Sequence, residues 1–210
     1  MITVVDYGRG NLFSLGQALG ALDLRFRFTD KADELAGREI IILPGVGAFG
    51  DAMEQLRRGG LDEAIVKAAA GGARILGICL GMQLLATRSK EFGDHEGLNL
   101  IAGEVRRLPD PAPRTPDPCR IPNIGWRRTT LGGGFAAAVD LDDAPYFYFV
   151  HSFSFYCADP ADLAGTIDVN GTNVAAIVGR GNIWGFQFHP EKSGQAGLTL
   201  LDRVLRAGSL

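Results

Sequence analysis

The sequence predicts an α/β fold built on a mainly parallel sheet, with antiparallel strands added in its second half. Two observations lead to this expectation. In the first half, short apolar runs alternate with segments of helical period, which is the pattern of strand–helix–strand units. In the second half, short strand-like runs follow one another with turn residues between them, which favours antiparallel pairing.

The elements of the first half follow from apolar spacing and capping residues. Asn11 can cap a helix whose leucines recur at helical spacing up to Leu22. Residues 40–43 form a continuous apolar run, as in the centre of a parallel sheet. We expect strands at residues 2–5, 25–28, 39–43 and 74–79, and helices after Asn11, at 61–70 and at 81–88.

The second half begins with a proline-rich stretch, residues 109–122, which holds six of the ten prolines and is expected to be an extended loop. Neither side of it has the pattern of an independent core, so residues 1–210 are interpreted as one domain. Three consecutive glycines, 132–134, indicate a flexible turn. Strands are expected at residues 146–150, 163–169, 174–178 and 183–188, and a final helix ends before Gly208.

Charge and cysteine content exclude several classes of protein. The chain has 21 Lys and Arg against 24 Asp and Glu, a net charge of −3, and no basic block, so binding to nucleic acid or to an anionic membrane is not expected. Its start lacks a basic and apolar leader, and no apolar run approaches the length of a membrane span. Three cysteines without a CxxC pair indicate a reducing compartment, so a cytoplasmic location is expected.

Cys79 stands where an apolar strand meets a helix, with glycine two places before it and two places after it. These small residues permit a sharp turn that lifts the side chain above the sheet, the sulfur counterpart of a nucleophile elbow. The N–H groups at the start of the helix favour a thiolate, and that of Leu80 can hold an oxyanion. Cys79 is therefore the candidate nucleophile, whereas Cys119 and Cys157 lack this context and are expected to be structural.

His189 and Glu191 lie two residues apart, directly after an expected strand. In extended backbone such residues point the same way, and a carboxylate bonded to one ring nitrogen leaves the other nitrogen free to serve a nucleophile. Pro190 between them stiffens the pair. His151 is a second candidate base without a neighbouring carboxylate, and His95 lies in a polar loop where it is expected to be solvated. No spacing of His, Cys and carboxylates indicates a metal site.

A glycine motif in residues 44–53 allows two interpretations. Gly45, Gly47 and Gly50 match G-x-G-x-x-G, which raises the alternative of a dinucleotide-binding oxidoreductase. Two features count against it: a proline separates the strand from the glycines, and the match follows the third expected strand rather than the first. In the other interpretation, this loop presents N–H groups to a substrate carbonyl as the second half of an oxyanion hole.

Together these motifs resemble the class I glutamine amidotransferases, which use a Cys-His-Glu triad. The resemblance rests on the cysteine elbow, on Pro-Gly-Val-Gly upstream and on Phe-His-Pro-Glu downstream. Asp-Tyr-Gly-x-Gly-Asn near the start, Tyr-Phe-Val-His-Ser and His-Pro-Glu-Lys-Ser make the chain similar to one branch, the glutaminase subunits of imidazole glycerol phosphate synthase. The match extends from Asp6 to about Leu201 and implies a three-layer, flavodoxin-like fold.

The resemblance implies a role for each matching position. Cys79 would be the nucleophile, His189 the general base and acid, and Glu191 the carboxylate that orients the ring. The backbone N–H groups of Val46 and Leu80 would stabilise the oxyanion. No cofactor and no metal are implied. The residues that would line the glutamine pocket are Gly47, Gln83, Ser152 and Phe153.

The resemblance also implies a partner, a (β/α)₈-barrel cyclase that forms a heterodimer with the glutaminase. Ammonia released from glutamine would pass to the cyclase, which makes imidazole glycerol phosphate and an aminoimidazole carboxamide ribonucleotide in histidine biosynthesis. Many sister amidotransferases have glycine where this chain has Val46, and a β-branched residue resists unusual backbone angles. We therefore expect this half of the oxyanion hole to form only on partner binding. The positions that match the partner surface are Trp126, Tyr148 and Lys192.

Two positions depart from the family pattern. The family usually reads Pro-His-Ile/Met-Gly-Trp-Asn where this chain reads Pro-Asn-Ile-Gly-Trp-Arg, so Asn123 replaces a histidine and Arg127 an asparagine. Both are expected near the partner interface rather than at the triad. They leave open a paralogous glutaminase that feeds ammonia to another acceptor. A non-catalytic interaction subunit on the same fold is a further alternative, which the intact Cys-His-Glu set disfavours.

Overall fold

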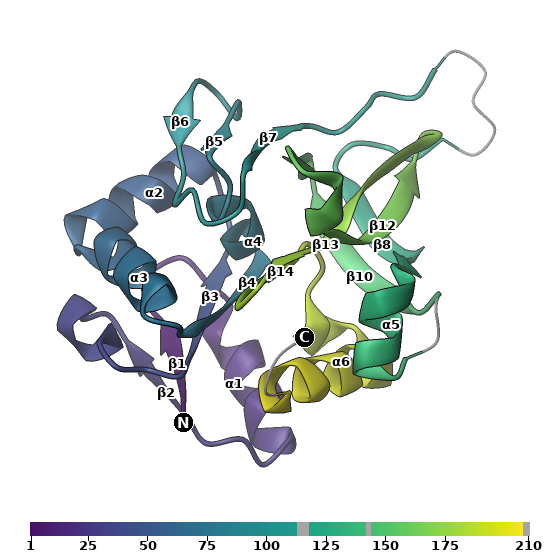
Figure 1. Cartoon of the computed structure of the whole chain (residues 1–210). Helices are drawn as coiled ribbons and strands as arrows, with labels where there is room; N and C mark the ends of the chain where they lie inside the picture. Colours follow the sequence, from purple (N-terminus) through teal and green to yellow (C-terminus); the bar gives the residue numbers. More distant parts are fainter. Residues whose placement is uncertain (113–117, 142–143, 208–210) are drawn as a thin grey trace.

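The central element is a mixed sheet whose parallel strands lie on one side and antiparallel strands on the other (Figure 1). The computed structural model describes residues 1–112, 118–141 and 144–207, and within them this sheet has eight strands in the order β2-β1-β3-β4-β14-β13-β12-β9. Neighbouring strands are parallel in the part β2-β1-β3-β4-β14 of this order. The pairs in the part β14-β13-β12-β9 are antiparallel. The strands are β1 (Ile2–Val5), β2 (Phe26–Thr29), β3 (Ile40–Gly45), β4 (Arg74–Cys79), β9 (Thr130–Leu131), β12 (Leu163–Val169), β13 (Thr172–Arg180) and β14 (Ile183–Phe186).

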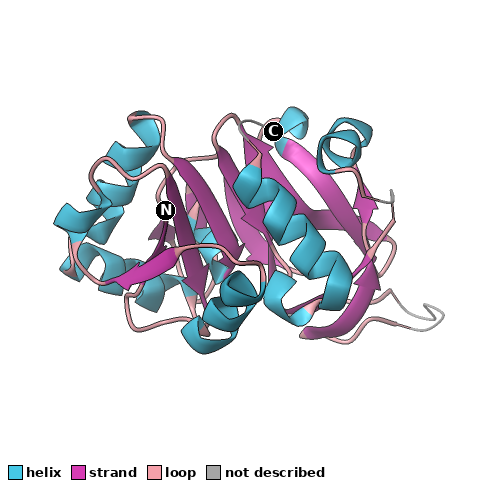
Figure 2. Cartoon of the chain, turned by 90° about the horizontal axis from the view of Figure 1, so that it is seen from below, coloured by secondary structure: helices cyan, strands magenta, loops and turns pink. Residues whose placement is uncertain are grey.

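Helices cover both faces of this sheet, which gives three layers (Figure 2). Strand β3 shows why: Ile40 and Ile42 are buried against one layer of helices, whereas Ile41 and Leu43 are buried against the other. An apolar run without alternation is what a strand covered on both faces requires. One layer holds α1 (Leu12–Ala21), α5 (Gly133–Val139) and α6 (Gly194–Arg206), and the other holds α2 (Phe49–Arg58), α3 (Leu61–Ala70) and α4 (Leu80–Leu84).

Two smaller sheets complete the fold. Strands β8 (Asn123–Arg128) and β10 (Tyr146–His151) form an antiparallel ribbon. The ribbon is fixed to the core by aromatic stacking, since the Phe147 and Phe188 ring centroids lie 4.0 Å apart. The second small sheet has the order β11-β7-β5-β6. Its strands are β5 (Arg88–Ser89), β6 (His95–Glu96), β7 (Gly103–Arg107) and β11 (Phe153–Cys157), and the 3₁₀ turns of the fold are η1 (Ala32–Leu35), η2 (Pro160–Asp162) and η3 (Pro190–Lys192).

Most expected elements are confirmed, but the helix expected at residues 81–88 is too long. Helix α4 ends at Leu84 and the chain turns into β5. The carbonyls of Leu84, Leu85 and Ala86 accept N–H groups from the returning segment 98–101, at 2.9 to 3.0 Å. These bonds satisfy the carbonyls that a helix end leaves open, so the helix stops early. The strand expected at 25–28 lies one residue later, at β2.

Two helices form where none was expected. Helix α2 begins inside the glycine motif and buries Phe49, Met53 and Leu56 at helical spacing. Helix α5 starts directly after Gly132, so the expected flexible turn at 132–134 is wrong. Its Phe135 ring stacks on Trp184 at 5.0 Å between centroids, and this packing outweighs the low helix propensity of glycine.

The expected proline-rich loop is only partly described. Residues 109–112 and 118–122 contain no helix or strand, and residues 113–117 lie outside the described residues. In the described part of the chain, no helix combines the length and the apolar character needed to cross a membrane.

Candidate active site

The turn between β4 and α4 holds Cys79 in a strained backbone conformation. Its φ of 56° and ψ of −114° are unusual for a residue with a side chain, and such strain marks nucleophile elbows. The turn requires glycine on both sides. A Cβ on Gly77 would lie 2.6 Å from the Gly81 carbonyl oxygen, and a Cβ on Gly81 would lie 1.8 Å from the Leu43 carbonyl oxygen. Leu80 is the first residue of α4, so its N–H has no acceptor within the helix.

His189 and Glu191 form a buried hydrogen-bonded pair. The distance from His189 Nδ1 to Glu191 Oε1 is 2.8 Å, and the two side chains are only 4% and 3% exposed. The β8–β10 ribbon holds the loop that carries them. The backbone N–H of His189 donates to the Tyr148 carbonyl at 3.0 Å, and the Ser193 hydroxyl links Tyr148 N–H to the His189 carbonyl. The base thus follows β14 of the central sheet and is also held by the ribbon.

A cavity of about 330 Å³ joins the elbow to this pair. Cys79 and His189 both line it, although 110 residues separate them in the sequence. The cavity lies at the carboxyl ends of β3 and β4, where open α/β sheets bind their ligands. Glu191 lies behind His189, outside the lining. All the expected oxyanion and pocket residues line the cavity: Val46, Gly47, Leu80, Gln83, Ser152 and Phe153.

The electrostatics of the site favour a charged His189. Burial disfavours a charged ring, but hydrogen bonds with Cys79 and Glu191 and their negative charges outweigh it and raise the pKa of His189 to about 10. Negative charges beside the ring favour its protonated form. The site is therefore suited to hold an imidazolium beside a nucleophilic sulfur.

One wall of the cavity is tied to α4 by side-chain amides. Gln83 Nε2 donates to the Phe153 carbonyl and to Gln187 Oε1, each at 3.0 Å. Gln83 is 5% exposed, and Gln187 is fully buried. These bonds tie the start of β11 and the residue after β14 to the helix that begins one residue after Cys79.

Glu91 is a cavity residue that the sequence did not reveal. Its Oε2 accepts the Phe49 N–H at 2.6 Å, at the first residue of α2, where a helix favours negative charge. Partial burial raises the pKa of Glu91, and the Phe49 N–H opposes that shift. It is the one carboxylate among the described residues that line this cavity. The sequence around Glu91 carries no motif. The helix whose N–H group holds Glu91, α2, was not predicted either.

The other two histidines do not resemble solvated bases. His151 is buried, and its two ring nitrogens lie 2.8 Å from the Phe153 carbonyl and 2.9 Å from Asn123 Nδ2. Both nitrogens are engaged, so the second-ranked base has no free nitrogen to offer. His95, expected to be solvated, is half-buried in β6. Its ring packs on Gly50, where an added Cβ would lie 2.6 Å away.

Trp126 and Tyr148 are neighbours on the ribbon, and Lys192 lies in the turn that is hydrogen-bonded to Tyr148. Trp126 pairs with Tyr148 across the ribbon, with ring centroids 6.2 Å apart. Trp126 is 53% exposed, and Lys192 is exposed in η3, just after His189. Of the two unusual residues on β8, Asn123 faces inward and is fully buried, so its contacts lie within the protein and not on the outer face.

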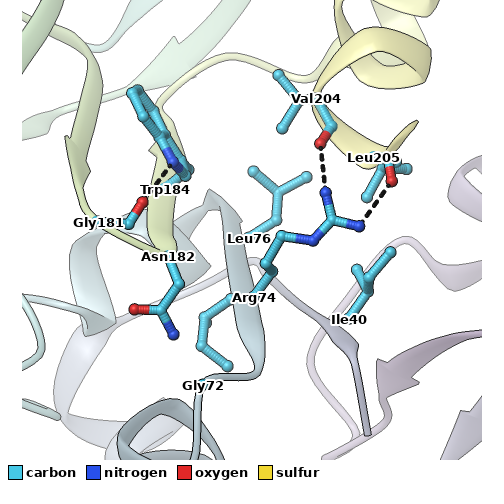
Figure 3. Close-up of a pocket in the computed structure, with 10 residues that line it drawn as sticks. Ile40, Gly72, Arg74, Leu76, Gly181, Asn182, Trp184, Val204 and Leu205 are labelled. Carbon is cyan, nitrogen blue, oxygen red and sulfur yellow. Dashed lines mark hydrogen bonds between the residues drawn. The ribbon is translucent and has the colours of Figure 1, made fainter. Parts of the chain in front are cut away.

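A second cavity, of about 150 Å³, lies at the opposite ends of the same strands (Figure 3). Arg74 at the start of β4 points across it and donates to the carbonyls of Val204 and Leu205 at the end of α6. Its guanidinium therefore caps a helix. The described residues lining this cavity include no cysteine, histidine or carboxylate, so the chemistry is assigned to the first cavity.

The elbow cysteine, the buried His-Glu pair and the three-layer sheet define a triad amidohydrolase of α/β architecture. The chain belongs to the class I glutamine amidotransferases: the sequence model of that family, "Glutamine amidotransferase class-I", matches residues 3–206. Its full-length relatives are subunits of imidazole glycerol phosphate synthase called HisH, and it belongs with them as a glutaminase. The interpretation as a dinucleotide-binding oxidoreductase is thereby replaced.

The sequence similarity spans almost the whole of both chains. The HisH subunit of Bacillus velezensis is 41% identical over 206 residues, which are 98% of this chain and 96% of that protein. The HisH subunit of Desulfitobacterium hafniense is 43% identical over 202 residues, which are 96% of this chain and 92% of that protein. The name of these relatives identifies them as subunits, so a partner subunit is implied.

Solved structures share the fold at lower identity. PurLQS from Thermotoga maritima superposes with a TM-score of 0.71 over 97% of this chain and 96% of that chain, at 22% identity. The glutaminase domain of Trypanosoma brucei CTPS, solved with bound acivicin, has a TM-score of 0.62 over 100% and 95% of the two chains, at 17% identity. These structures confirm the three-layer amidotransferase fold.

Proposed function

We propose that Cys79, His189 and Glu191 hydrolyse the side-chain amide of glutamine in the 330 Å³ cavity. The observation that carries this proposal is the convergence of a strained elbow cysteine and a buried His-Glu pair on one cavity. Nucleophile, base and orienting carboxylate are the three parts that nucleophilic acyl transfer requires.

In the first step, the Cys79 thiolate attacks the amide carbon and forms a tetrahedral intermediate. Its oxyanion is held by the backbone N–H groups of Val46 and Leu80, which line the same cavity as Cys79. His189, protonated by virtue of its raised pKa, donates its proton to the leaving nitrogen. The C–N bond breaks, ammonia departs and a cysteinyl thioester of glutamate remains.

In the second step, water cleaves the thioester. Acylation has removed the negative charge on Cys79, and with it much of what raises the pKa of His189. The ring is then neutral and accepts a proton from the attacking water, while Glu191 keeps it oriented. Glutamate is released and the thiolate is restored. One group thus acts as acid and then as base because its neighbour changes charge.

Glutamine recognition is assigned to four further residues of the cavity lining. Gly47, Gln83, Ser152 and Phe153 line the cavity together with Cys79. Glu91 places the one carboxylate of this lining where an α-ammonium group can pair with it. Glutamine carries both the ammonium and the reactive amide, which suits a cavity with an anion at one side and a nucleophile at another.

The partner is proposed to be a (β/α)₈-barrel cyclase that forms a heterodimer with this chain. The exposed ring of Trp126, with Tyr148 and Lys192 beside it, supports this docking surface. Ammonia would protonate in bulk water and lose its nucleophilicity, so transfer through a dry path is favoured. In the cyclase it is consumed to make imidazole glycerol phosphate and aminoimidazole carboxamide ribonucleotide. Because the three cysteines are free, we place the enzyme in the reducing cytoplasm.

The Val46 half of the oxyanion hole is proposed to depend on the partner. Val46 follows the last residue of β3, is 41% exposed and precedes Gly47, whose φ is +102°. A β-branched side chain restricts the peptide rotation that would aim its N–H at the oxyanion. Docking of the cyclase supplies the contacts that stabilise that rotation.

A glutaminase assay with and without the cyclase and its ribonucleotide substrate tests these proposals. We expect glutamate to form slowly with the isolated chain and at least about 10-fold faster in the complex, and not at all with Cys79→Ala. Glutamate formation that survives Cys79→Ala would contradict the mechanism. A rate unaffected by the cyclase would instead favour a glutaminase coupled to another acceptor.

A further inference from the structure

A chain of buried polar groups runs from β8 to the wall of the active-site cavity. Arg127 Nε lies 2.8 Å from Asn123 Oδ1, and Asn123 Nδ2 lies 2.9 Å from His151 Nε2. His151 Nδ1 in turn lies 2.8 Å from the Phe153 carbonyl oxygen. Asn123 is fully buried and His151 is 6% exposed. The mechanism uses none of Arg127, Asn123 and His151.

Arg127 sets the direction of every hydrogen bond in this series of polar groups. A guanidinium group only donates, so the amide oxygen of Asn123 must face it and the NH₂ group must face His151. That NH₂ group donates to His151 Nε2, which therefore carries no proton. The single ring proton is on Nδ1 and is donated to the Phe153 carbonyl. Only one tautomer of a neutral imidazole satisfies the whole chain.

The surroundings of His151 agree with this neutral state. Burial lowers its pKa to about 4, the Phe153 carbonyl opposes that shift and the charge of Arg127 adds to it. The titratable groups in the surroundings of His151 come from two sides. Arg127 and the Cys119 thiol lie on the β8 side, while Cys79, Glu91 and His189 line the same cavity.

We propose that Asn123, oriented by Arg127, is a positioning residue for the glutamine pocket. It fixes the ring of His151, and that ring fixes the carbonyl of Phe153 in the pocket wall. The same carbonyl also accepts from Gln83 at 3.0 Å, so His151 at the end of β10 and Gln83 on α4 both hold this point of the wall. This role rests on the proposed glutamine pocket and adds to it the residues that set its shape.

Four substitutions separate the parts of this series of polar groups. In Arg127→Met the amide of Asn123 is free to rotate and to offer its oxygen to a protonated Nε2, so the His151 pKa rises by about 1 unit or more. Asn123→Asp places a carboxylate oxygen beside His151 Nε2 with little change in side-chain shape, and the pKa of His151 rises further. Arg127→Lys retains a cation that only donates hydrogen bonds. The pKa of His151 should therefore stay low in this variant, unlike in Arg127→Met. Arg128→Met removes an equal charge from the exposed face of the same strand and leaves the titration unchanged.

The experiment combines NMR titration of the histidine rings in the full chain with glutaminase kinetics in the cyclase complex. The parent chain has three histidines, so the His151 signal is assigned with His151→Gln. We expect Arg127→Met and Asn123→Leu to raise KM for glutamine by about 5- to 10-fold and to change kcat by less than about 2-fold, as when uniform binding is lost.

The proposal is overturned if His151 of the parent titrates near its ordinary pKa, or if both substitutions leave KM unchanged. A parent complex without glutaminase activity would overturn the proposed function instead. Even without glutaminase activity, the NMR titration still tests the hydrogen bonds between Arg127, Asn123 and His151, because it requires no turnover.

Discussion

The two sides of the active site are held by different forces. The elbow on β4 and α4 is fixed by backbone contact, with Gly77 and Gly81 packed so closely that neither admits a Cβ. The β8–β10 ribbon, in contrast, holds His189 through its N–H bond to the Tyr148 carbonyl and the pocket wall through His151. Steric contact is all or nothing, whereas a hydrogen-bonded arrangement can be altered in steps. We infer that the elbow sets whether the enzyme works and the ribbon sets how well.

The largest effect is expected at the nucleophile. Cys79→Ala removes the attacking sulfur, so glutaminase kcat should fall by about 10⁴-fold or more, with KM little changed. The matched control is Cys157→Ala, which removes a free, half-buried thiol from β11 that does not line the cavity. Its activity should stay near that of the parent. Equal losses in both variants would show that cysteine removal acts through folding and not through chemistry.

The steric character of the elbow is tested by Gly81→Ala. The added Cβ would meet the Leu43 carbonyl at 1.8 Å, so the free energy of unfolding should fall by about 3 kcal/mol or more. Gly134→Ala adds the same methyl group in α5, where nothing lies within 4 Å, and should stabilise by about 0.5–1 kcal/mol. Denaturant unfolding measures both. Similar stability of the two variants would refute the close packing at the elbow.

The hydrogen-bonded side is tested by Glu191→Gln. Loss of the carboxylate lowers the pKa of His189, and kcat should fall by about 10- to 100-fold because the ring loses its orientation. In the parent, the raised pKa means that the stabilisation from the charged ring is complete below about pH 6.5 and is lost as the pH rises through about 10. NMR titration should show His189 losing its proton at lower pH in the variant. An unchanged titration would mean that Glu191 does not act on the ring.

The smallest effect is expected on the outer face of the ribbon. Trp126→Ala removes a half-exposed ring from the proposed docking surface and should weaken cyclase binding by about 10-fold. Glutamine turnover at saturating cyclase should change little. Val66→Ala, which removes exposed apolar surface from α3, should leave the affinity unchanged in a calorimetric titration. Equal weakening by both substitutions would place the partner elsewhere.

The sequence predicted the sheet and the triad because both depend on short-range signals. The apolar run in β3 and the glycines around Cys79 are local features with one simple structural solution. Helix α2 was missed because its first residues coincide with a glycine motif, and packing of Phe49, Met53 and Leu56 decides that segment. Tertiary contact outweighs local propensity in such cases.

The missing parts of the site were those created by contacts between distant segments. Glu91 enters the cavity because α2 offers it a backbone N–H at Phe49, 42 residues away in the sequence. Asn123 meets His151 because β8 and β10 pair in a register that places them opposite each other. Strand register between separated segments has no signature in either segment alone. The sequence predicted Asn123 only to lie near the partner interface, and its full burial and its contact with His151 emerge from the structure.

The most direct measurement of the central claim is mass spectrometry of the complex quenched with acid during glutamine turnover. If Cys79 attacks the amide, one glutamyl group should be attached to the chain and should map to the peptide that contains Cys79. Glu191→Gln should accumulate more of this species, because deacylation needs an oriented His189. A glutamyl group on Cys119 or Cys157, or full glutaminase activity in Cys79→Ala, would contradict the account.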